Sequence, residues 1–203
     1  MSSAITVRLS SGRAYCSGVL IHPDLQGATD ARTEYMLSCA HFLRERTGPI
    51  RVGGAFFHAR VRGAVRLPRT DIAVLRLDRP SPPKDLLRLS TRPAPWLLPT
   101  VTQGFGKSWH KLQHRTGRVL LRTPLALGRN LHTLVTSAAI LYNKPRAVKG
   151  DSGGPVIIDN QIVAVQSMIT DPFGWNTGLA TVAQVAPHRR AIQAAVQALE
   201  RAY

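Results

Sequence analysis

Short apolar runs, separated at close intervals by turn residues, limit the fold of this chain more than any other feature. Runs such as "DIAVLRL", "GRVLLRT" and "GPVIIDNQIVAV" are rich in Val, Ile, Leu and Thr, and Gly, Pro, Asn or Asp bound them. Many short strands with regular turn signals are typical of an all-β sandwich or barrel. Within the last of these runs, Asp159 and Asn160 predict a tight hairpin turn.

The C-terminal segment has a different periodicity. Ile192, Val196 and Leu199 recur at helical spacing after Pro187, which predicts an amphipathic helix over residues 187–203. Residues 78–99 hold six prolines and suit a connection that crosses the surface between two halves. We therefore expect one domain with an N-terminal β lobe (1–90), a C-terminal β lobe (91–186) and a C-terminal helix (187–203).

The charge balance is strongly one-sided. In 203 residues, 27 Lys and Arg oppose 11 Asp and Glu, which gives a formal net charge of +16. Such a field attracts acidic or polyanionic partners.

No apolar run is long enough to span a membrane, and the N-terminus lacks the features of a secretory signal. We expect a cytoplasmic protein, or a secreted one if a leader precedes this sequence, and a monomer unless a larger complex holds it. The Ala- and Arg-rich composition suggests a bacterial source.

The segment "KGDSGGPV", residues 149–156, places Ser152 among glycines, either as a nucleophile in a shaped turn or as part of an ordinary loop. A serine hydroxyl is a poor nucleophile unless a base takes its proton. His41 follows the strand-like run "YMLSCA", and Asp71 begins the run "DIAVLRL". An aspartate beside such a run is expected to be partly buried and to need a partner, for which an imidazole N–H is suitable.

These segments, in this order, resemble the trypsin-like (chymotrypsin-fold) serine peptidases. "CSGVLI" and "LSCAHF" are similar to the family's first-barrel strand and histidine motif, "TDIAVLRL" to its aspartate segment, and "GDSGGPV" matches its nucleophile loop. "QGFG", "IVAVQS" and "TGLATVAQVAP" extend the similarity over nearly the whole chain. The resemblance implies two packed six-stranded antiparallel β-barrels, with the active site in the cleft between them and an α-helix at the C-terminus.

The resemblance also implies a role for each motif residue. His41 is the general base and later the general acid, Asp71 orients it, and Ser152 attacks the carbonyl carbon. The backbone N–H groups of Gly150 and Ser152 form the oxyanion hole, and Ser167 lies near Asp71. The implied activity is that of a serine endopeptidase acting on proteins or peptides through an acyl-enzyme, without a cofactor. The histidines show no spacing typical of metal ligands.

By the same resemblance, the substrate pocket is formed by Arg146, Ala147, Gln166, Ser167 and Met168. Specificity for a basic residue requires an acid near the first two of these positions, and none is present. Gln166 stands where some relatives that cut after Glu or Gln carry a histidine. With the net positive charge, these features favour an acidic or polar residue before the scissile bond.

Asp151 precedes the nucleophile, and in relatives activated by cleavage it pairs with a newly formed N-terminus. This sequence shows no activating cleavage site, and a buried aspartate must still be paired. We expect a cation to replace the ammonium: Lys144, Arg146, Lys149, or an arginine of the second barrel. The alternative is an unpaired Asp151 whose oxyanion hole is ordered by a partner. If a cation of the chain pairs with Asp151, we expect a regulatory enzyme that becomes active without cleavage.

Two cysteines are too few for a disulfide scaffold. Cys39 lies two residues before His41, whereas Phe42 occupies the position of the family's usual second cysteine. A bridge between Cys16 and Cys39 is conceivable, but two buried thiols are favoured because cytosolic thiols stay reduced.

A second class of function stays open beside the enzyme, an inactive or weakly active binding module that uses its basic surface for polyanions or acidic proteins. The mixed basic and aromatic stretch at residues 106–115, which includes Trp109, is more simply interpreted as a solvated loop. The presence of all three triad residues favours the enzyme.

Overall fold

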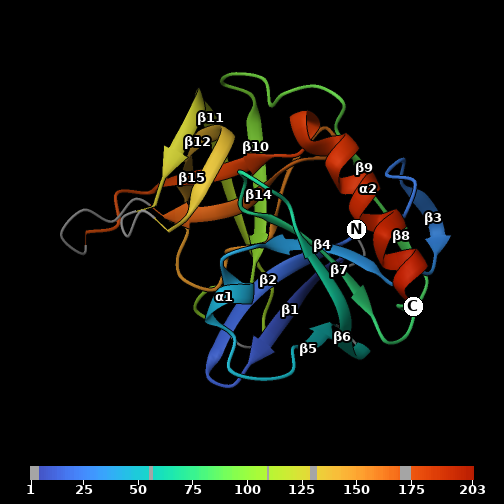
Figure 1. Ribbon diagram of the computed structural model, residues 1–203. Helices are drawn as coiled ribbons and strands as arrows, with labels where there is room; N and C mark the ends of the chain where they lie inside the picture. The colour runs from blue at the N-terminus through green and yellow to red at the C-terminus, as the bar shows by residue number, and fades with distance from the viewer. Residues whose placement is uncertain (1–4, 55–56, 109, 129–131, 170–174) are drawn as a thin grey trace.

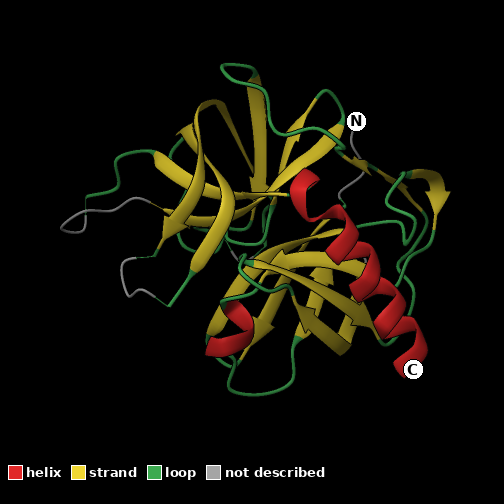
Figure 2. Cartoon of the chain, turned by 45° about the horizontal axis from the view of Figure 1, so that its top comes forward, coloured by secondary structure: helices red, strands yellow, loops and turns green. Residues whose placement is uncertain are grey.

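The computed structural model describes residues 5–54, 57–108, 110–128, 132–169 and 175–203. It consists of two β-barrels packed side by side, with a helix at the C-terminus (Figure 1, Figure 2). The predicted fold, two six-stranded antiparallel barrels followed by an α-helix, is confirmed.

The first barrel closes in the order β1-β2-β4-β7-β6-β5. Inward side chains alternate with outward ones, most clearly along β6, because successive side chains of a strand point to opposite faces. Its strands are β1 (Thr6–Ser11), β2 (Ala14–Leu20), β4 (Tyr35–Cys39), β5 (Arg51–Gly54), β6 (Phe57–Arg66) and β7 (Ile72–Leu77).

The second barrel follows the order β13-β10-β11-β12-β15-β14, and pairing of β13 with β14 closes it. Asp159 and Asn160 join β13 to β14 with φ of 46° and 58°, and Ile158 pairs with Gln161. This is the predicted two-residue hairpin turn, in which both central residues have positive φ. The strands are β10 (Pro99–Gly104), β11 (Gln113–Leu127), β12 (Leu134–Lys144), β13 (Pro155–Ile158), β14 (Gln161–Ile169) and β15 (Leu179–Gln184).

Several short elements complete the chain. The strands β3 (Ala28–Ala31) and β8 (Lys84–Leu86) form a small separate sheet, and β9 (Arg88–Leu89) pairs in parallel with β14 of the second barrel. A single helical turn, α1 (Phe42–Glu45), follows β4. The division at residues 90 and 91 stays a prediction.

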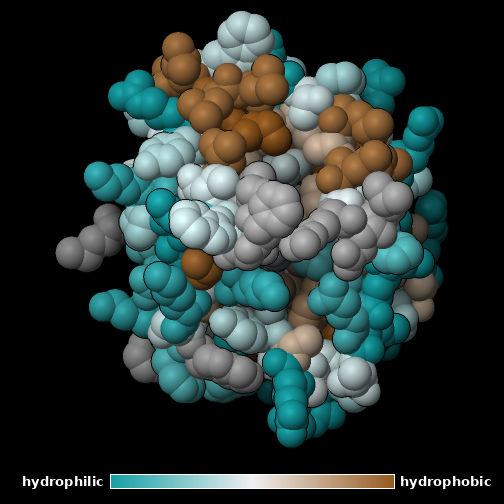
Figure 3. All heavy atoms as spheres, turned by 90° about the vertical axis from the view of Figure 1, so that its left-hand side faces the viewer, coloured by the Kyte–Doolittle hydropathy of each residue, from teal (hydrophilic) through white to brown (hydrophobic). Residues whose placement is uncertain are grey.

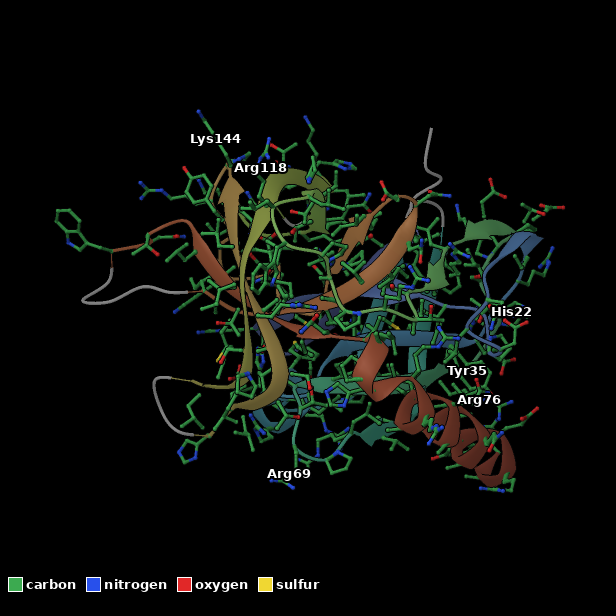
Figure 4. The ribbon with its side chains drawn as sticks, turned by 90° about the horizontal axis from the view of Figure 1, so that it is seen from above. His22, Tyr35, Arg69, Arg76, Arg118 and Lys144 are labelled. Carbon is green, nitrogen blue, oxygen red and sulfur yellow. The ribbon has the colours of Figure 1, made fainter. Side chains whose placement is uncertain are left out.

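The C-terminal helix α2 (Arg189–Ala202) follows a 3₁₀ turn, Ala186–His188, that contains Pro187. It buries Ile192, Ala195, Val196 and Leu199. The helix contacts β6 and β7 of the first barrel. Arg76 of β7 donates to the Leu199 carbonyl oxygen at 3.0 Å and lies over the ring of Tyr35, both beside the helix in Figure 4. The helix therefore fastens the end of the chain back onto the first lobe.

The main hydrophobic core runs from the first barrel into the second. Buried residues of both barrels and of α2 belong to one continuous cluster, and a smaller cluster fills the interior of the second barrel. Because buried apolar side chains join the lobes, their strand ends are held in a defined relative position. Apolar side chains also reach the surface on the face of the molecule shown in Figure 3. Strand β11 of the second barrel exposes Leu120, Leu121, Leu125 and Leu127.

Candidate active site

The pairing of β4 with β7 brings His41 and Asp71 together. Cys39, the last residue of β4, lies opposite Ile72, the first residue of β7, so the residues just beyond these strand ends are neighbours. Asp71 Oδ2 lies 2.7 Å from His41 Nδ1, and Asp71 Oδ1 accepts the His41 backbone N–H at 2.8 Å. With only 1% of the Asp71 side chain exposed, this carboxylate holds both the ring and the backbone of the histidine.

Ser167 of β14 connects this pair to Ser152. Its hydroxyl donates to Asp71 Oδ2 at 2.5 Å, and its carbonyl oxygen accepts the Ser152 hydroxyl at 3.0 Å. The expected contact between Ser167 and Asp71 is therefore present. The Ser152 proton points at a carbonyl oxygen, so this hydroxyl must shift before an imidazole can accept it.

Ser17 of β2 holds the loop that carries Ser152. Its backbone N–H donates to the Ser152 carbonyl oxygen at 2.7 Å, and its hydroxyl donates to the Gly150 carbonyl oxygen at 2.7 Å. Glycine is required in this loop for two reasons. Gly150 and Gly153 have φ of +99° and +85°, and a Cβ at Gly153 would overlap the Ser17 carbonyl oxygen.

Among the five residues 150–154 of this loop, two backbone N–H groups have no acceptor in the part of the chain that the structure describes, those of Gly150 and Ser152. The other three donate inside the protein: Asp151 to Val148 O, Gly153 to Gln166 O and Gly154 to Asp151 O. Backbone N–H groups are obligatory donors. Two neighbouring donors left unused beside a serine hydroxyl can therefore stabilise a negatively charged oxygen.

Asp151 is fully buried and forms an ion pair with Arg115 of β11. Arg115 Nε lies 2.6 Å from Asp151 Oδ2, and the two side chains are 2% and 0% exposed. The carboxylate also accepts the backbone N–H groups of Gly106 at 2.9 Å and Val148 at 2.8 Å. Hence the cation expected beside Asp151 is an arginine of the second barrel. A buried carboxylate with three donors is fixed in position, because any loss of a donor leaves its charge uncompensated.

The position of Arg115 corrects one sequence expectation. The sequence favours a solvated loop over residues 106–115, whereas Arg115, the last of them, is buried in the second barrel. Trp109 lies outside the described residues. The sequence did carry a signal for the burial of Arg115. Arg115 lies four residues before Val119 on the same strand, and residues an even number of positions apart on a strand face the same side. Lys144 and Lys149 lie exposed and form no ion pair with a described carboxylate.

Opposing effects act on the pKa of His41. Burial lowers it, and the neighbouring Cys39 and Asp71 raise it, with a net rise above the ordinary value of 6.5. Burial also raises the pKa of the Cys39 thiol well above its ordinary range. Cys39 is therefore neutral near pH 7, and Asp71 is the charge that favours the protonated imidazole there. Cys16 and Cys39 are free, buried thiols, as favoured from the sequence.

Asn176, which the sequence did not single out, organises the residues of the expected pocket. Its amide donates to the Ala147 carbonyl oxygen at 2.6 Å, and its Oδ1 accepts the Gly178 N–H at 2.9 Å. Arg146 is exposed, and its guanidinium donates to the Asn176 carbonyl oxygen. Asn176 therefore connects residues 176–178 to Arg146 and Ala147, two of the five residues expected in the pocket.

Gln166 and Met168 lie on β14 on either side of Ser167. Gln166 is fully buried and donates from Nε2 to the Met168 carbonyl oxygen at 3.1 Å. Its Oε1 has no hydrogen-bond partner in the described part of the chain. Met168 is half-buried.

The described residues contain no group of three His, Cys, Asp or Glu side chains that could hold a metal ion. None of the helices described is long and apolar enough to cross a bilayer.

Two closed six-stranded antiparallel barrels packed side by side define the trypsin-like fold class. The family model "Trypsin" matches residues 2–187, and the chain belongs to that family. No curated protein sequence matches it.

Solved structures share the fold at low sequence identity. The active form of the Rv3671c protease from M. tuberculosis aligns with a TM-score of 0.72 and 17% identity, covering 94% of this chain and 80% of that one. Kallikrein-related peptidase 10, in a complex with Zn²⁺, aligns with a TM-score of 0.71 and 21% identity over 96% of each chain. A serine endoprotease from Yersinia pestis aligns with a TM-score of 0.69 and 15% identity, covering 97% of this chain and 64% of that one.

We predict that Asp71→Asn lowers the pKa of His41, because the neutral amide removes the charge that favours the imidazolium. NMR titration of the ring measures the shift. The matched control is Asp24→Asn, which alters the exposed pair of Asp24 with His22. An unchanged pKa of His41 in Asp71→Asn would contradict the assignment of this charge.

The raised pKa of His41 in the wild type also makes the stability of the fold depend on pH. Because the folded-state pKa of His41 lies above 6.5, its stabilising effect is fully present below pH 6.5 and is lost as pH rises through the folded-state value. The free energy of unfolding should therefore fall more steeply above pH 6.5 in the wild type than in Asp71→Asn. Urea titrations at several pH values measure these slopes.

Proposed function

We propose that the chain is a serine endopeptidase in which His41, Asp71 and Ser152 form the catalytic triad. The observation that supports it best is a buried carboxylate bonded to both His41 Nδ1 and the Ser167 hydroxyl, while Ser167 also accepts the Ser152 hydroxyl. Two unused backbone N–H groups beside that hydroxyl supply the remaining requirement.

In this proposal His41 Nε2 accepts the Ser152 proton as Oγ attacks the substrate carbonyl carbon. The tetrahedral oxyanion accepts hydrogen bonds from the N–H groups of Gly150 and Ser152, and Asp71 stabilises the imidazolium. The imidazolium then protonates the leaving amine. Water attacks the acyl-enzyme by the same route, which releases the acid and restores Ser152.

An active-site fluorophosphonate tests the proposal. We expect it to label the wild type on Ser152, and Ser152→Ala to abolish labelling and to lower the turnover of a peptide substrate by about 10⁴- to 10⁶-fold. Ser90→Ala, a change at a buried serine outside the cleft, is the control. A wild type that folds but is neither labelled nor active, and binds polyanions tightly at low salt, would instead indicate the binding module.

We propose further that the enzyme prefers an acidic or polar residue before the scissile bond. None of the five residues that the resemblance assigns to the pocket, Arg146, Ala147, Gln166, Ser167 and Met168, is acidic, and one of them, Arg146, is a cation. A panel of fluorogenic peptides that vary this residue should show cleavage after Glu or Gln and little after Arg or Lys. Arg146→Gln should lower the ratio of cleavage after Glu to cleavage after Gln by about two- to fivefold, the usual worth of an exposed ion pair. A clear preference for Arg or Lys would contradict the assignment.

We also propose that the enzyme is active without cleavage, because Arg115 occupies the role that a new N-terminal ammonium has in cleaved relatives. Removing one partner of a buried ion pair typically costs about 3–5 kcal/mol. Arg115→Met should lower the free energy of unfolding by this amount and should lower turnover by about 10²- to 10³-fold if the oxyanion hole is disordered. Arg118→Met, an exposed change on the same strand, should have little effect on either.

Mass spectrometry of the active preparation supplies the decisive comparison. Hydrolysis by the intact 22.2 kDa chain supports the proposal, and activity confined to a processed form would exclude it. Free buried thiols at Cys16 and Cys39 support an intracellular, reducing location. There we propose a monomeric enzyme with a regulatory role toward a protein substrate.

A further inference from the structure

The outer face of β1, β5 and β6, on the first barrel, carries a row of basic side chains. Alternation places Leu9, Val52 and Ala59 in the core. It turns the intervening residues outward, namely Arg8, Ser10, Arg51, Gly53, His58 and Arg60. We call this set the basic face. It contains no acidic residue, and it lies on strands β1, β5 and β6, whereas the triad lies beyond the ends of β4 and β7 and on the Ser152 loop (Figure 1).

Register places two arginines of the basic face directly opposite each other. Ser10 pairs with Arg51 across β1 and β5, and Arg51 pairs with Arg60 across β5 and β6. Like charges in this arrangement destabilise a sheet. Neither guanidinium forms an ion pair with a carboxylate among the described residues. The side chain of Asp78 lies beside Arg60 but accepts only the backbone N–H of Arg60, at 3.0 Å. The ion pair of Asp78 is with Arg79, at 3.5 Å.

A hollow of about 340 Å³ opens between these arginines and the loop that follows α1. One wall is fixed, because the Ser11 hydroxyl donates to the Gly48 carbonyl oxygen at 2.9 Å and accepts the Gly48 N–H at 3.1 Å. A Cβ at Gly48 would meet no atom within 4 Å, so this glycine borders open space. The hollow is lined by Ser10, Gly12, Gly48, Pro49, Arg51 and Arg60.

We propose that this hollow binds closely spaced oxyanion groups, phosphate or sulfate, and so forms an anion site separate from the catalytic cleft. A guanidinium offers a planar pair of donors that matches the oxygens of such groups. Two opposed guanidinium groups and the Ser10 hydroxyl supply donors from three adjacent strands, and the bound anion relieves the repulsion between the arginines. None of the lining residues is aromatic, so the site recognises oxyanions and offers no platform for stacking bases.

Calorimetric titration at low salt tests the site with two probes, tripolyphosphate for phosphate and a heparin tetrasaccharide for sulfate. We expect one of them at least to bind the wild type, and the tighter one identifies the source of the oxyanion. The double variant Arg51→Gln/Arg60→Gln should lose about tenfold or more in affinity, since charged hydrogen bonds are the strong ones.

The matched control is Arg118→Gln/Lys144→Gln, which removes the same net charge from exposed positions on the second barrel (Figure 4). It should lose less than about twofold in affinity if binding is local. An equal loss in both double variants would show that only the net charge of the protein matters and would overturn the proposal. Absence of binding by the wild type would overturn it as well.

Thermal unfolding provides an independent readout. Without ligand at low salt, Arg60→Gln should raise the melting temperature, because it removes a like-charge contact. The bound anion should raise the melting temperature of the wild type and leave that of the Arg51→Gln/Arg60→Gln variant nearly unchanged. A lower melting temperature of unliganded Arg60→Gln would show that this arginine is structural and would contradict the proposal. Peptide hydrolysis should be unaffected in the double variant, so the anion site and the proposed peptidase function are tested separately.

Discussion

A fully buried carboxylate needs donors on every side, and Asp151 organises the second-barrel side of the candidate active site because of that need. Its oxygens are held by Arg115 from β11 and by backbone N–H groups of Gly106 and Val148. The loop that bears Ser152 cannot move away from β10 and β11 without exposing an unpaired charge to an apolar interior. The loop that this ion pair holds is the one in which the N–H groups of Gly150 and Ser152 have no acceptor among the described residues.

Hydrogen bonds across the lobe interface complete the arrangement. Ser17 of the first barrel binds the Ser152 loop and also accepts the Phe105 N–H at 2.9 Å. Thr6 donates to Gln103 Oε1 at 2.6 Å, and both residues are buried. Because Ser167 of the second barrel binds Asp71 of the first, each lobe positions a side chain of the other. The site is therefore a property of the packed pair of barrels, and neither lobe contains it alone.

The arginines that give the chain its positive charge lie in very different surroundings. Arg115 is buried and structural, and Arg76 binds the C-terminal helix. Arg51 and Arg60 face each other on an open sheet surface, where no described carboxylate forms an ion pair with them. The same guanidinium group therefore stands in three different environments. A net charge of +16 therefore says little until each cation is placed.

Local sequence determined the class of fold and the identity of the candidate triad. Periodicity of two in the short apolar runs predicts strands, the period of the last segment predicts α2, and the segments around His41, Asp71 and Ser152 carry enough specific residues to be recognised. Such signals lie within a few neighbouring positions and need no knowledge of the rest of the chain. Three features were decided only by the tertiary structure. They are the selection of Arg115 among the cations expected beside Asp151, the hydrogen bonds of the Ser167 carbonyl oxygen and of Asn176, and the opposition of Arg51 and Arg60. Each depends on strand register and barrel closure, which bring residues distant in the chain within a few ångströms, and no local pattern encodes those distances.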